Sequence, residues 1–187
     1  MPQWINLEIV TMEKREIRVQ VRHRIASLSE EQREQASHHI FEQVASLPDF
    51  VGARVVALFS SLPDEPCSQQ FLQEWHGRKR IVLPRVEGGV MNFYDYSPTQ
   101  MQSGAFGIDE PQGDTPCPPE DIELMVVPGV AFTLDGKRMG RGKGFYDKYL
   151  SHSGFRATTV GVCFAVQMVD NLPDEPHDQR VDIVVNG

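Results

Sequence analysis

The chain has 187 residues, of which 40% are hydrophobic and 24% are charged, and its formal net charge is −8. These values are typical of a globular domain, and they exclude intrinsic disorder and collagen-like repetition. An acidic chain also disfavours nucleic acid as a partner, since such proteins need a basic surface against the phosphates. No apolar run approaches the roughly 20 residues of a transmembrane helix, so we expect no membrane partner.

The first residues and the cysteines indicate the compartment. The opening sequence MPQWINLEIV lacks the basic and then apolar regions of a secretory signal peptide. Three widely spaced cysteines, Cys67, Cys117 and Cys163, disfavour a disulfide framework. We therefore expect a cytoplasmic protein. Residues 1–11 fit the first predicted helix poorly, and we treat them as an N-terminal extension of unknown relevance.

Two helices are predicted near the N-terminal end. Residues 13–28 carry apolar residues at helical spacing. Beside them runs a basic stripe of Lys14, Arg18 and Arg22, which periodicity alone assigns to the solvent. Ser29 opens the capping-box sequence SEEQ, which starts the second helix.

Strands and helices alternate along the rest of the chain. A helix follows Ser68 as its cap, and residues 97–121, rich in Pro, Gly and Asp, are predicted to form a long surface loop. This alternation predicts one α/β domain at 12–187, a Rossmann-like three-layer α/β/α arrangement with a mostly parallel, mixed sheet. The predicted strands are 54–60, 79–83, 90–96, 122–127, 158–164 and 181–185, and a further helix starts at 145.

The most informative stretch is VVPGVAFTLDGKRMGRGKGFYDKYL at 126–150. A strand ends at Pro128, the dipeptide Asp135-Gly136 turns the chain, and a glycine-rich run leads directly into a helix. Glycines let the backbone approach a ligand and adopt positive φ, so that successive N–H groups can form an anion nest. The pattern predicts a site for several phosphate oxygens, built from Lys137, Arg138, Gly140, Arg141, Gly142, Lys143, Gly144 and the helix N-terminus.

Asp147 stands in the first turn of that helix, where a carboxylate beside a polyphosphate suits Mg²⁺. Without a ligand, the same residue is a favourable partner of the helix dipole. Two common phosphate-binding patterns do not match. The phosphate loop needs Ser or Thr where Gly144 stands, and the dinucleotide fingerprint needs Gly where Phe145 stands. Sequence signatures of zinc sites and of Ser-His-Asp hydrolases are not present either.

The sequence LDGKRMGRGKGFYDKYL strongly resembles the signature of the 5-formyltetrahydrofolate cyclo-ligase family, the methenyltetrahydrofolate synthetases. The resemblance extends from about Lys14 to Val185. Its weaker elements are an early KxxxR at 14–18, PDE at 63–65, LPR at 83–85, an aromatic residue at 106 before IxEP at 108–111, and RVD at 180–182.

The resemblance implies a reaction. ATP transfers its terminal phosphate to the formyl oxygen of 5-formyltetrahydrofolate, and the second folate nitrogen then attacks the activated carbon and releases phosphate. The product is 5,10-methenyltetrahydrofolate. The implied cofactor is Mg²⁺, with ATP as co-substrate, and we expect the enzyme to be a monomer.

The resemblance also implies roles for individual residues. It implies ATP binding by Lys14, Arg18, Arg138, Gly140, Arg141, Gly142, Lys143, Gly144, Phe145 and Tyr146. It implies substrate binding by Ser60, Glu65, Phe106, Arg141, Lys143 and Tyr146, and Mg²⁺ binding by Asp147 and Asp182. This assignment replaces the solvent interpretation for two members of the basic stripe and leaves it for Arg22.

The chemistry suggests how these residues act. We hypothesise that Arg141 and Lys143 are catalytic, neutralising charge on the moving phosphoryl group, and that Tyr146 orients the formyl group. Glu65 can accept two N–H bonds from the amino-pyrimidine edge of the pterin. Arg85 is either a partner for phosphate or folate carboxylates or a surface charge at a strand end.

Two residues depart from the family pattern. The family commonly has Tyr where Phe145 stands, so ring packing is kept while a hydroxyl is lost. Some members have Trp where Phe106 stands, so stacking is kept without an indole N–H. Both departures bear on substrate affinity.

Two other functions compete with this one. A sugar-phosphate isomerase on a similar scaffold would use the glycine-rich run for one phosphate, but it would not need so many cations or the Mg²⁺ carboxylates. A non-catalytic binder of folate or nucleotide would tend to lose charged positions that this chain retains.

Overall fold

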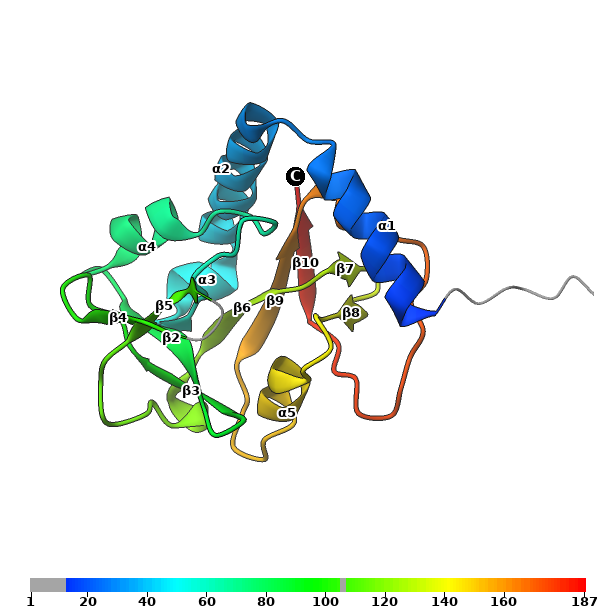
Figure 1. Ribbon diagram of the computed structural model, residues 1–187. Coiled ribbons are helices and arrows are strands. Elements are labelled where there is room, and N and C mark those ends of the chain that lie inside the picture. Colours follow the sequence, from blue (N-terminus) through cyan, green and yellow to red (C-terminus); the bar gives the residue numbers. More distant parts are fainter. Residues whose placement is uncertain (1–12, 105–106) are drawn as a thin grey trace, which may run out of the picture.

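A six-stranded sheet organises the residues that the computed structural model describes, 13–104 and 107–187 (Figure 1). The strands of this sheet and of two small pairs are β1 (Val55–Ala57), β2 (Arg80–Glu87), β3 (Val90–Asp95), β4 (Met101–Ser103), β5 (Asp109–Pro111), β6 (Leu124–Pro128), β7 (Ala131–Phe132), β8 (Arg138–Met139), β9 (Thr158–Cys163) and β10 (Ile183–Asn186). The sheet order is β10-β9-β6-β1-β2-β3, and only β2 and β3 pair antiparallel. The predicted mostly parallel, mixed sheet is confirmed.

Helices lie on both sides of this sheet. They are α1 (Lys14–Ala26), α2 (Glu30–Ser46), α3 (Pro48–Gly52), α4 (Gln69–Trp75) and α5 (Phe145–Leu150), with the 3-10 turns η2 (Pro119–Asp121) and η3 (Ala165–Gln167). Buried side chains of the first four helices pack in one core, whereas α5 contributes to the other. Within the described residues, no helix is both long and apolar enough to cross a bilayer.

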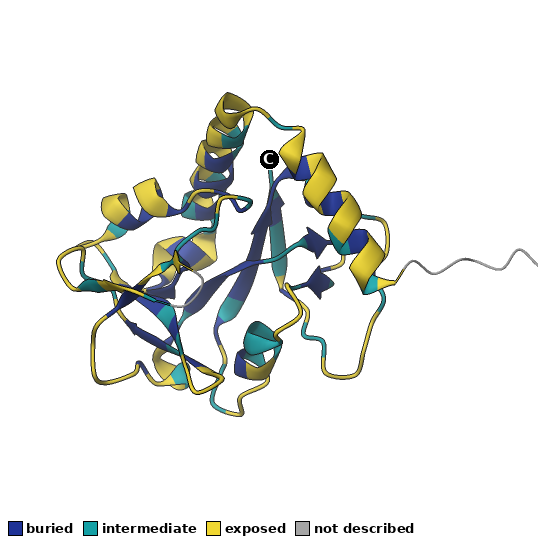
Figure 2. Ribbon diagram, viewed as in Figure 1, coloured by how far each residue is buried: buried dark blue, intermediate teal, exposed yellow. Residues whose placement is uncertain are grey.

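The central strands are buried on both faces, as their apolar composition predicts (Figure 2). In β1, Val56 belongs to the core beneath α1 to α4, and Ala57 belongs to the core on the α5 side. All five residues of β6 are buried, and they alternate in the same way. The sheet is therefore a rigid platform whose ends carry the polar loops.

Local signals predict the N-terminal helices well. The α2 capping box is present, because Ser29 Oγ accepts from the Gln32 N–H at 3.1 Å and Gln32 Oε1 accepts from the Ser29 N–H at 2.9 Å. Ser68 does precede α4, but its predicted capping role is wrong. Its hydroxyl donates to the Phe59 carbonyl at 2.5 Å and thereby fixes the segment that follows β1.

The segment 97–121 contains more structure than the predicted loop. The strands β4 and β5 pair antiparallel within it, and η2 closes it. The Asp135-Gly136 turn is confirmed, because it joins β7 to β8, with Gly136 at φ 86°. The same turn brings the glycine-rich run back towards the end of β6.

The strand order reverses between β1 and β6. From β1 the chain proceeds outward through β2 and β3, and from β6 it proceeds in the other direction through β9 and β10. Ligands of open α/β sheets bind at such a switch point, beyond the carboxyl ends of the strands. The loops that leave β1 and β6 therefore define where a site is expected.

Candidate active site

A cavity of about 470 Å³ lies where those loops meet, a volume within the range of small-molecule sites. The loop after β1, the end of β6 and the β8–α5 connection line it, together with α1 and residues 175–178. The predicted site residues that line it are Lys14, Arg18, Glu65, Arg138, Gly140, Arg141, Gly142, Lys143, Gly144, Phe145, Tyr146 and Asp147.

The glycine-rich run has the backbone geometry that its sequence predicts. Gly142 and Gly144 have φ of 105° and 71°, a region that favours glycine. A Cβ on Gly140 would lie 3.2 Å from Arg138 Nη1, so glycine permits a close approach there. Arg18 Nε donates to the Gly140 carbonyl at 2.9 Å, which ties α1 to this run.

Lys14 reaches the cavity from the first turn of α1. Its Nζ lies 2.6 Å from Glu175 Oε2 and 2.7 Å from Asp178 Oδ2. Burial alone would lower the pKa of Lys14, but its bonds to Asp178 and Glu175 outweigh burial and raise the pKa. The same ion pair holds the pKa of Asp178 below its usual value, although burial acts in the opposite direction. Both groups are therefore charged at neutral pH.

Arg138 forms the floor of the cavity, and its side chain is only 3% exposed. Its Nη1 donates to the Pro128 carbonyl at 3.1 Å, and its Nη2 lies 3.4 Å from Asp147 Oδ1. Burial lowers the pKa of Arg138, and the charge of Asp147 opposes this effect. Arg138 thus acts chiefly as a support for its neighbours.

Asp147 and Tyr146 rest on this support. Asp147 Oδ1 also accepts from the Gln179 N–H at 3.0 Å, which joins α5 to the segment that carries Asp178. The Arg138 guanidinium lies 5.4 Å from the Tyr146 ring centre. Burial raises the pKa of Tyr146, so its hydroxyl stays protonated and can donate a hydrogen bond.

Arg141 crosses from the glycine-rich run to the loop after β1. It holds Asp64 by two bonds, from Nη2 to Oδ1 at 2.5 Å and from Nη1 to Oδ2 at 3.2 Å, and its Nη2 also lies 3.2 Å from Glu65 Oε1. Glu65 accepts from the Leu62 N–H at 2.9 Å. Burial raises the pKa of Glu65, and this effect exceeds the lowering by Leu62 and Arg141.

Two predicted residues, Ser60 and Lys137, are not part of the cavity lining. Ser60 follows β1, but its hydroxyl donates to the Asp109 carbonyl at 3.1 Å and it is not part of the cavity lining. Lys137 turns towards Asp174, at 3.7 Å, and Asn171. Phe106 lies outside the described residues.

Asp182, predicted to bind Mg²⁺ together with Asp147, does not line the cavity that Asp147 lines. It is exposed and lies just before β10, away from the cavity lining. Its Oδ2 accepts from the Thr159 N–H at 2.8 Å and from the Thr159 hydroxyl at 2.9 Å. The structure therefore does not pair Asp182 with Asp147, because the RVD sequence starts a strand that runs beside β9.

Asp178 and Glu175 line the cavity instead, and the sequence interpretation missed both. The ligand atoms of Glu175, His177 and Asp178 all lie within 4.8 Å of one another. The signal in the sequence was the acidic run DEPHD at 174–178, which one residue, Gln179, separates from the RVD sequence. Asp147 is not in that group but lines the same cavity, and these carboxylates offer the oxygen donors that Mg²⁺ prefers, so their chemistry fits that ion.

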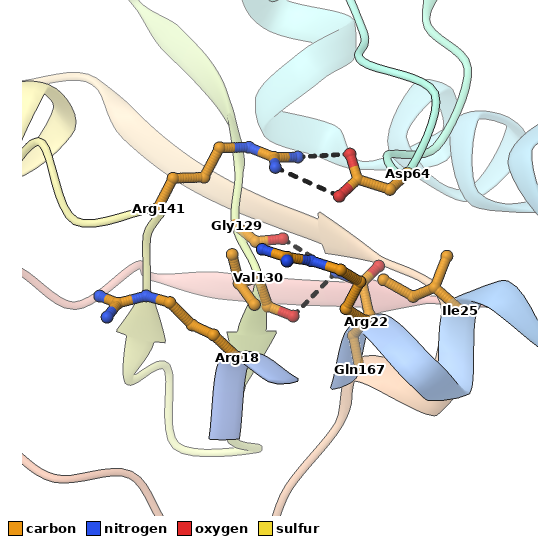
Figure 3. A pocket seen from close by; sticks show the side chains of 8 residues that line it. All are labelled: Arg18, Arg22, Ile25, Asp64, Gly129, Val130, Arg141 and Gln167. Atoms are coloured by element: carbon orange, nitrogen blue, oxygen red, sulfur yellow. Dashed lines mark hydrogen bonds and ion pairs between the residues drawn. The ribbon is translucent and has the colours of Figure 1, made fainter. Parts of the chain in front are cut away.

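A smaller pocket of about 60 Å³ adjoins the cavity, and Figure 3 shows its lining. Arg18, Gly129 and Arg141 line both spaces, so the two are neighbours. The small pocket also includes Arg22, which the sequence interpretation left in solvent.

The fold and the site together define a class. This is an α/β protein whose switch point holds a cationic, glycine-rich loop together with the buried carboxylate of Glu65, as expected for an enzyme that handles phosphate groups. The profile of the 5-formyltetrahydrofolate cyclo-ligase family matches residues 10–187, and the chain belongs to this family. The predicted family and enzyme class are confirmed.

Individual relatives agree with this membership. The chain is 30% identical to the 5-formyltetrahydrofolate cyclo-ligase of Haemophilus influenzae, covering 94% of this chain and 98% of the relative. It is 38% identical to the solved 5,10-methenyltetrahydrofolate synthetase of Aquifex aeolicus, with a TM-score of 0.84 and coverage of 94% and 90%. For the Mycoplasma pneumoniae synthetase the identity is 25% and the TM-score 0.72, with coverage of 93% and 98%.

Proposed function

We propose that the chain catalyses the ATP- and Mg²⁺-dependent cyclisation of 5-formyltetrahydrofolate to 5,10-methenyltetrahydrofolate, with release of ADP and phosphate. The observation that carries this proposal is one cavity that joins a cationic glycine-rich loop to the buried carboxylate of Glu65. The first suits a polyphosphate and the second suits the N–H groups of a pterin. One chain supplies both, which supports a monomer as the active form.

The glycine-rich loop and α1 bind the phosphates of ATP in this proposal. Backbone N–H groups near Gly142 and Gly144 face the phosphate oxygens, and Lys14, Arg18 and Lys143 supply full charges. Lys14 exchanges part of its contact with Glu175 and Asp178 for the nucleotide. The existing ion pairs hold its side chain near the required position before ATP arrives, which reduces the entropy lost on binding.

The folate binds on the Glu65 side. A carboxylate can accept two N–H bonds from the amino-pyrimidine edge, and such charge-assisted bonds are strong in a buried place. Because burial disfavours the charged form of Glu65, ligand N–H groups and Arg141 together stabilise the carboxylate when the folate arrives. Tyr146 donates its hydroxyl hydrogen to the formyl oxygen and orients it.

The reaction then has two steps. The formyl oxygen attacks the terminal phosphorus of ATP, an O–P bond forms, and the bond to the leaving ADP oxygen breaks. The second folate nitrogen next attacks the activated formyl carbon and gives up its proton to solvent, the C–O bond breaks, and phosphate leaves. Arg141 and Lys143 stabilise the negative charge that develops on the transferring group, which is the main source of catalysis in phosphoryl transfer.

Asp147 and Asp178, with Glu175 nearby, would hold Mg²⁺. When bound, the ion supplies charge neutralisation for the phosphate oxygens of ATP. The role of Arg138 is to hold the Asp147 carboxylate in position through its contact at 3.4 Å. Lys14 does the same for Asp178.

A direct assay tests the proposal. Purified protein is mixed with 5-formyltetrahydrofolate, ATP and Mg²⁺, and methenyl absorbance is followed. We expect a signal that requires ATP and is lost when EDTA removes Mg²⁺. Folded protein that gives no ATP-dependent signal would refute the enzyme assignment, and a signal in the presence of EDTA would refute the metal assignment.

A further inference from the structure

The small pocket beside the main cavity gathers three arginines. Arg18 and Arg22 reach it from α1, and Arg141 reaches it from the glycine-rich run (Figure 3). Of the eight residues that line it, all within the described chain, Asp64 alone carries a carboxylate. Positive charge therefore outweighs negative charge in a space of about 60 Å³.

Two of these arginines have partners in the structure. Arg141 donates hydrogen bonds from both terminal nitrogens to Asp64, and Arg18 Nε donates to the Gly140 carbonyl at 2.9 Å. Among the residues drawn in Figure 3, by contrast, Arg22 makes no hydrogen bond or ion pair. Its guanidinium is therefore available to a ligand at the side of the cavity where Arg141 and Arg18 already stand.

The floor of the pocket does not oppose an anion. The carbonyl oxygens of Gly129 and Val130 accept from Gln167 Nε2 at 2.9 Å and 3.0 Å. Gln167 is itself only 1% exposed, and its Oε1 accepts from the Phe164 N–H at 2.8 Å. Because these polar groups are satisfied by one another, the guanidinium groups determine what the pocket attracts.

We propose that this pocket is a phosphate subsite and that Arg22 is one of its binding residues. The volume suits one tetrahedral group and is too small for a nucleoside. Arginine binds phosphate through paired N–H donors, and three arginine side chains line this space against one carboxylate, which suits a dianion. The group is the terminal phosphate of ATP or the inorganic phosphate released by the reaction; this choice of source rests on the proposed function.

Asp64 competes for the same donors. It occupies both terminal nitrogens of Arg141, so an arriving phosphate takes over part of that pair. Removal of its charge therefore strengthens phosphate binding, whereas removal of Arg22 weakens it. These opposite signs separate a binding role from a merely structural one.

The test is calorimetric titration of the full chain with inorganic phosphate, together with KM for ATP in the absorbance assay. We expect Arg22→Ala to weaken phosphate binding about tenfold, in line with the loss of one charge-assisted hydrogen bond. Arg22→Lys restores part of it, and Asp64→Asn tightens it severalfold. The control is Arg24→Ala, an exposed arginine of α1 outside the pocket lining.

Each outcome decides the matter. A higher KM for ATP in Arg22→Ala identifies the terminal phosphate of ATP as the occupant. Weaker binding of inorganic phosphate with an unchanged KM identifies the phosphate released by the reaction. Unchanged values for both overturn the subsite. Phosphate binding by a wild-type chain without turnover would sustain the subsite while refuting the proposed function.

Discussion

Two buried arginines, Arg85 and Arg138, lie in environments that look alike. Each residue as a whole is 8% exposed, and each has a buried Nε that donates no hydrogen bond in the described structure, although Arg85 Nε lies 3.2 Å from Glu87 Oε1. Each donates to a backbone carbonyl, of Pro111 and Pro128 respectively. Each also faces a tyrosine ring, at 3.7 Å for Arg85 and 5.4 Å for Arg138. By burial and bonding alone the two could not be told apart.

Their surroundings differ. Arg85 lies in β2 and donates to Pro111 and Gly113, so it fixes the chain beyond β5, and it is not part of the cavity lining. Arg138 stands at the switch point beside Asp147. A buried charge is therefore no evidence of function by itself; its position at the carboxyl ends of β1 and β6 is what distinguishes Arg138. Neither sequence interpretation of Arg85, as a ligand partner or as a surface charge, describes its position.

The largest expected effect is on the reaction rate, and it concerns Lys143, which lines the same cavity as Arg138. Lys143→Ala removes a donor to the transferring phosphoryl group, and we expect the rate to fall on the order of 10²–10³. Lys148→Ala is the matched control, because Lys148 is exposed on α5 and is not part of the cavity lining. Turnover by methenyl absorbance and folding by circular dichroism measure both. Equal rates for the two variants would remove Lys143 from the mechanism.

The two arginines themselves give the next largest effect. Arg138→Met leaves Asp147 without its buried partner, and we expect a loss of about 3 kcal/mol of stability. Arg85→Met leaves the buried Pro111 carbonyl unsatisfied and removes a second bond, to the carbonyl of the exposed Gly113, and we expect a loss of about 2 kcal/mol. Urea unfolding measures the free energies. Under conditions where both variants are folded, only Arg138→Met should weaken Mg²⁺-ATP binding, and equal weakening by both would contradict the distinction.

Glu65 is a third buried charged residue, and the effect of its charge on the stability of the fold should depend on pH. Because burial raises its pKa in the folded state, ionised Glu65 lowers the stability of the fold at neutral pH. Glu65→Gln should therefore be the more stable protein at pH 7 to 8, and this gain should vanish as pH falls below the ordinary value of 4.5, where both states are protonated.

Thermal unfolding of both proteins across this pH range tests the sign. Folate affinity should fall about tenfold in the same variant, since one charge-assisted bond is lost. A less stable Glu65→Gln at neutral pH would mean that the pairing with Arg141 outweighs burial.

The sequence predicts well whatever depends on neighbouring residues. The Ser29 capping box and the positive φ of Gly142 are local, and both follow from the residues themselves. The pairs β4–β5 and β7–β8 are only two or three residues long, so no periodicity reveals them. Arg22 illustrates the limit in the site: helical spacing placed it on a stripe, but what stands opposite that stripe depends on the path of the chain after β6.

Asp178 and Asp182, only four positions apart, show the same limit of prediction from sequence. Both are aspartates in one polar segment, and a pattern of residue types cannot tell which carboxylate turns inward. Asp178 lies before the chain leaves the carboxyl edge of the sheet and contacts Lys14 at 2.7 Å. Asp182 lies at the start of β10, which runs parallel to β9, and so at the amino edge of the sheet. Its partner there is Thr159.

The smallest expected effect follows from this difference. Asp182→Asn keeps the shape of the side chain and part of its bonding to Thr159, so we expect a loss of about 1 kcal/mol or less in stability and an unchanged Mg²⁺ requirement. Asp178→Asn, by contrast, should raise the Mg²⁺ concentration needed for half-maximal turnover, because it removes a cavity carboxylate and the partner of Lys14. Titration of activity with Mg²⁺ compares the two. A higher Mg²⁺ requirement in Asp182→Asn alone would mean that the ion is bound near β10, and the carboxylates of the cavity would then serve only to hold Lys14 and Arg138.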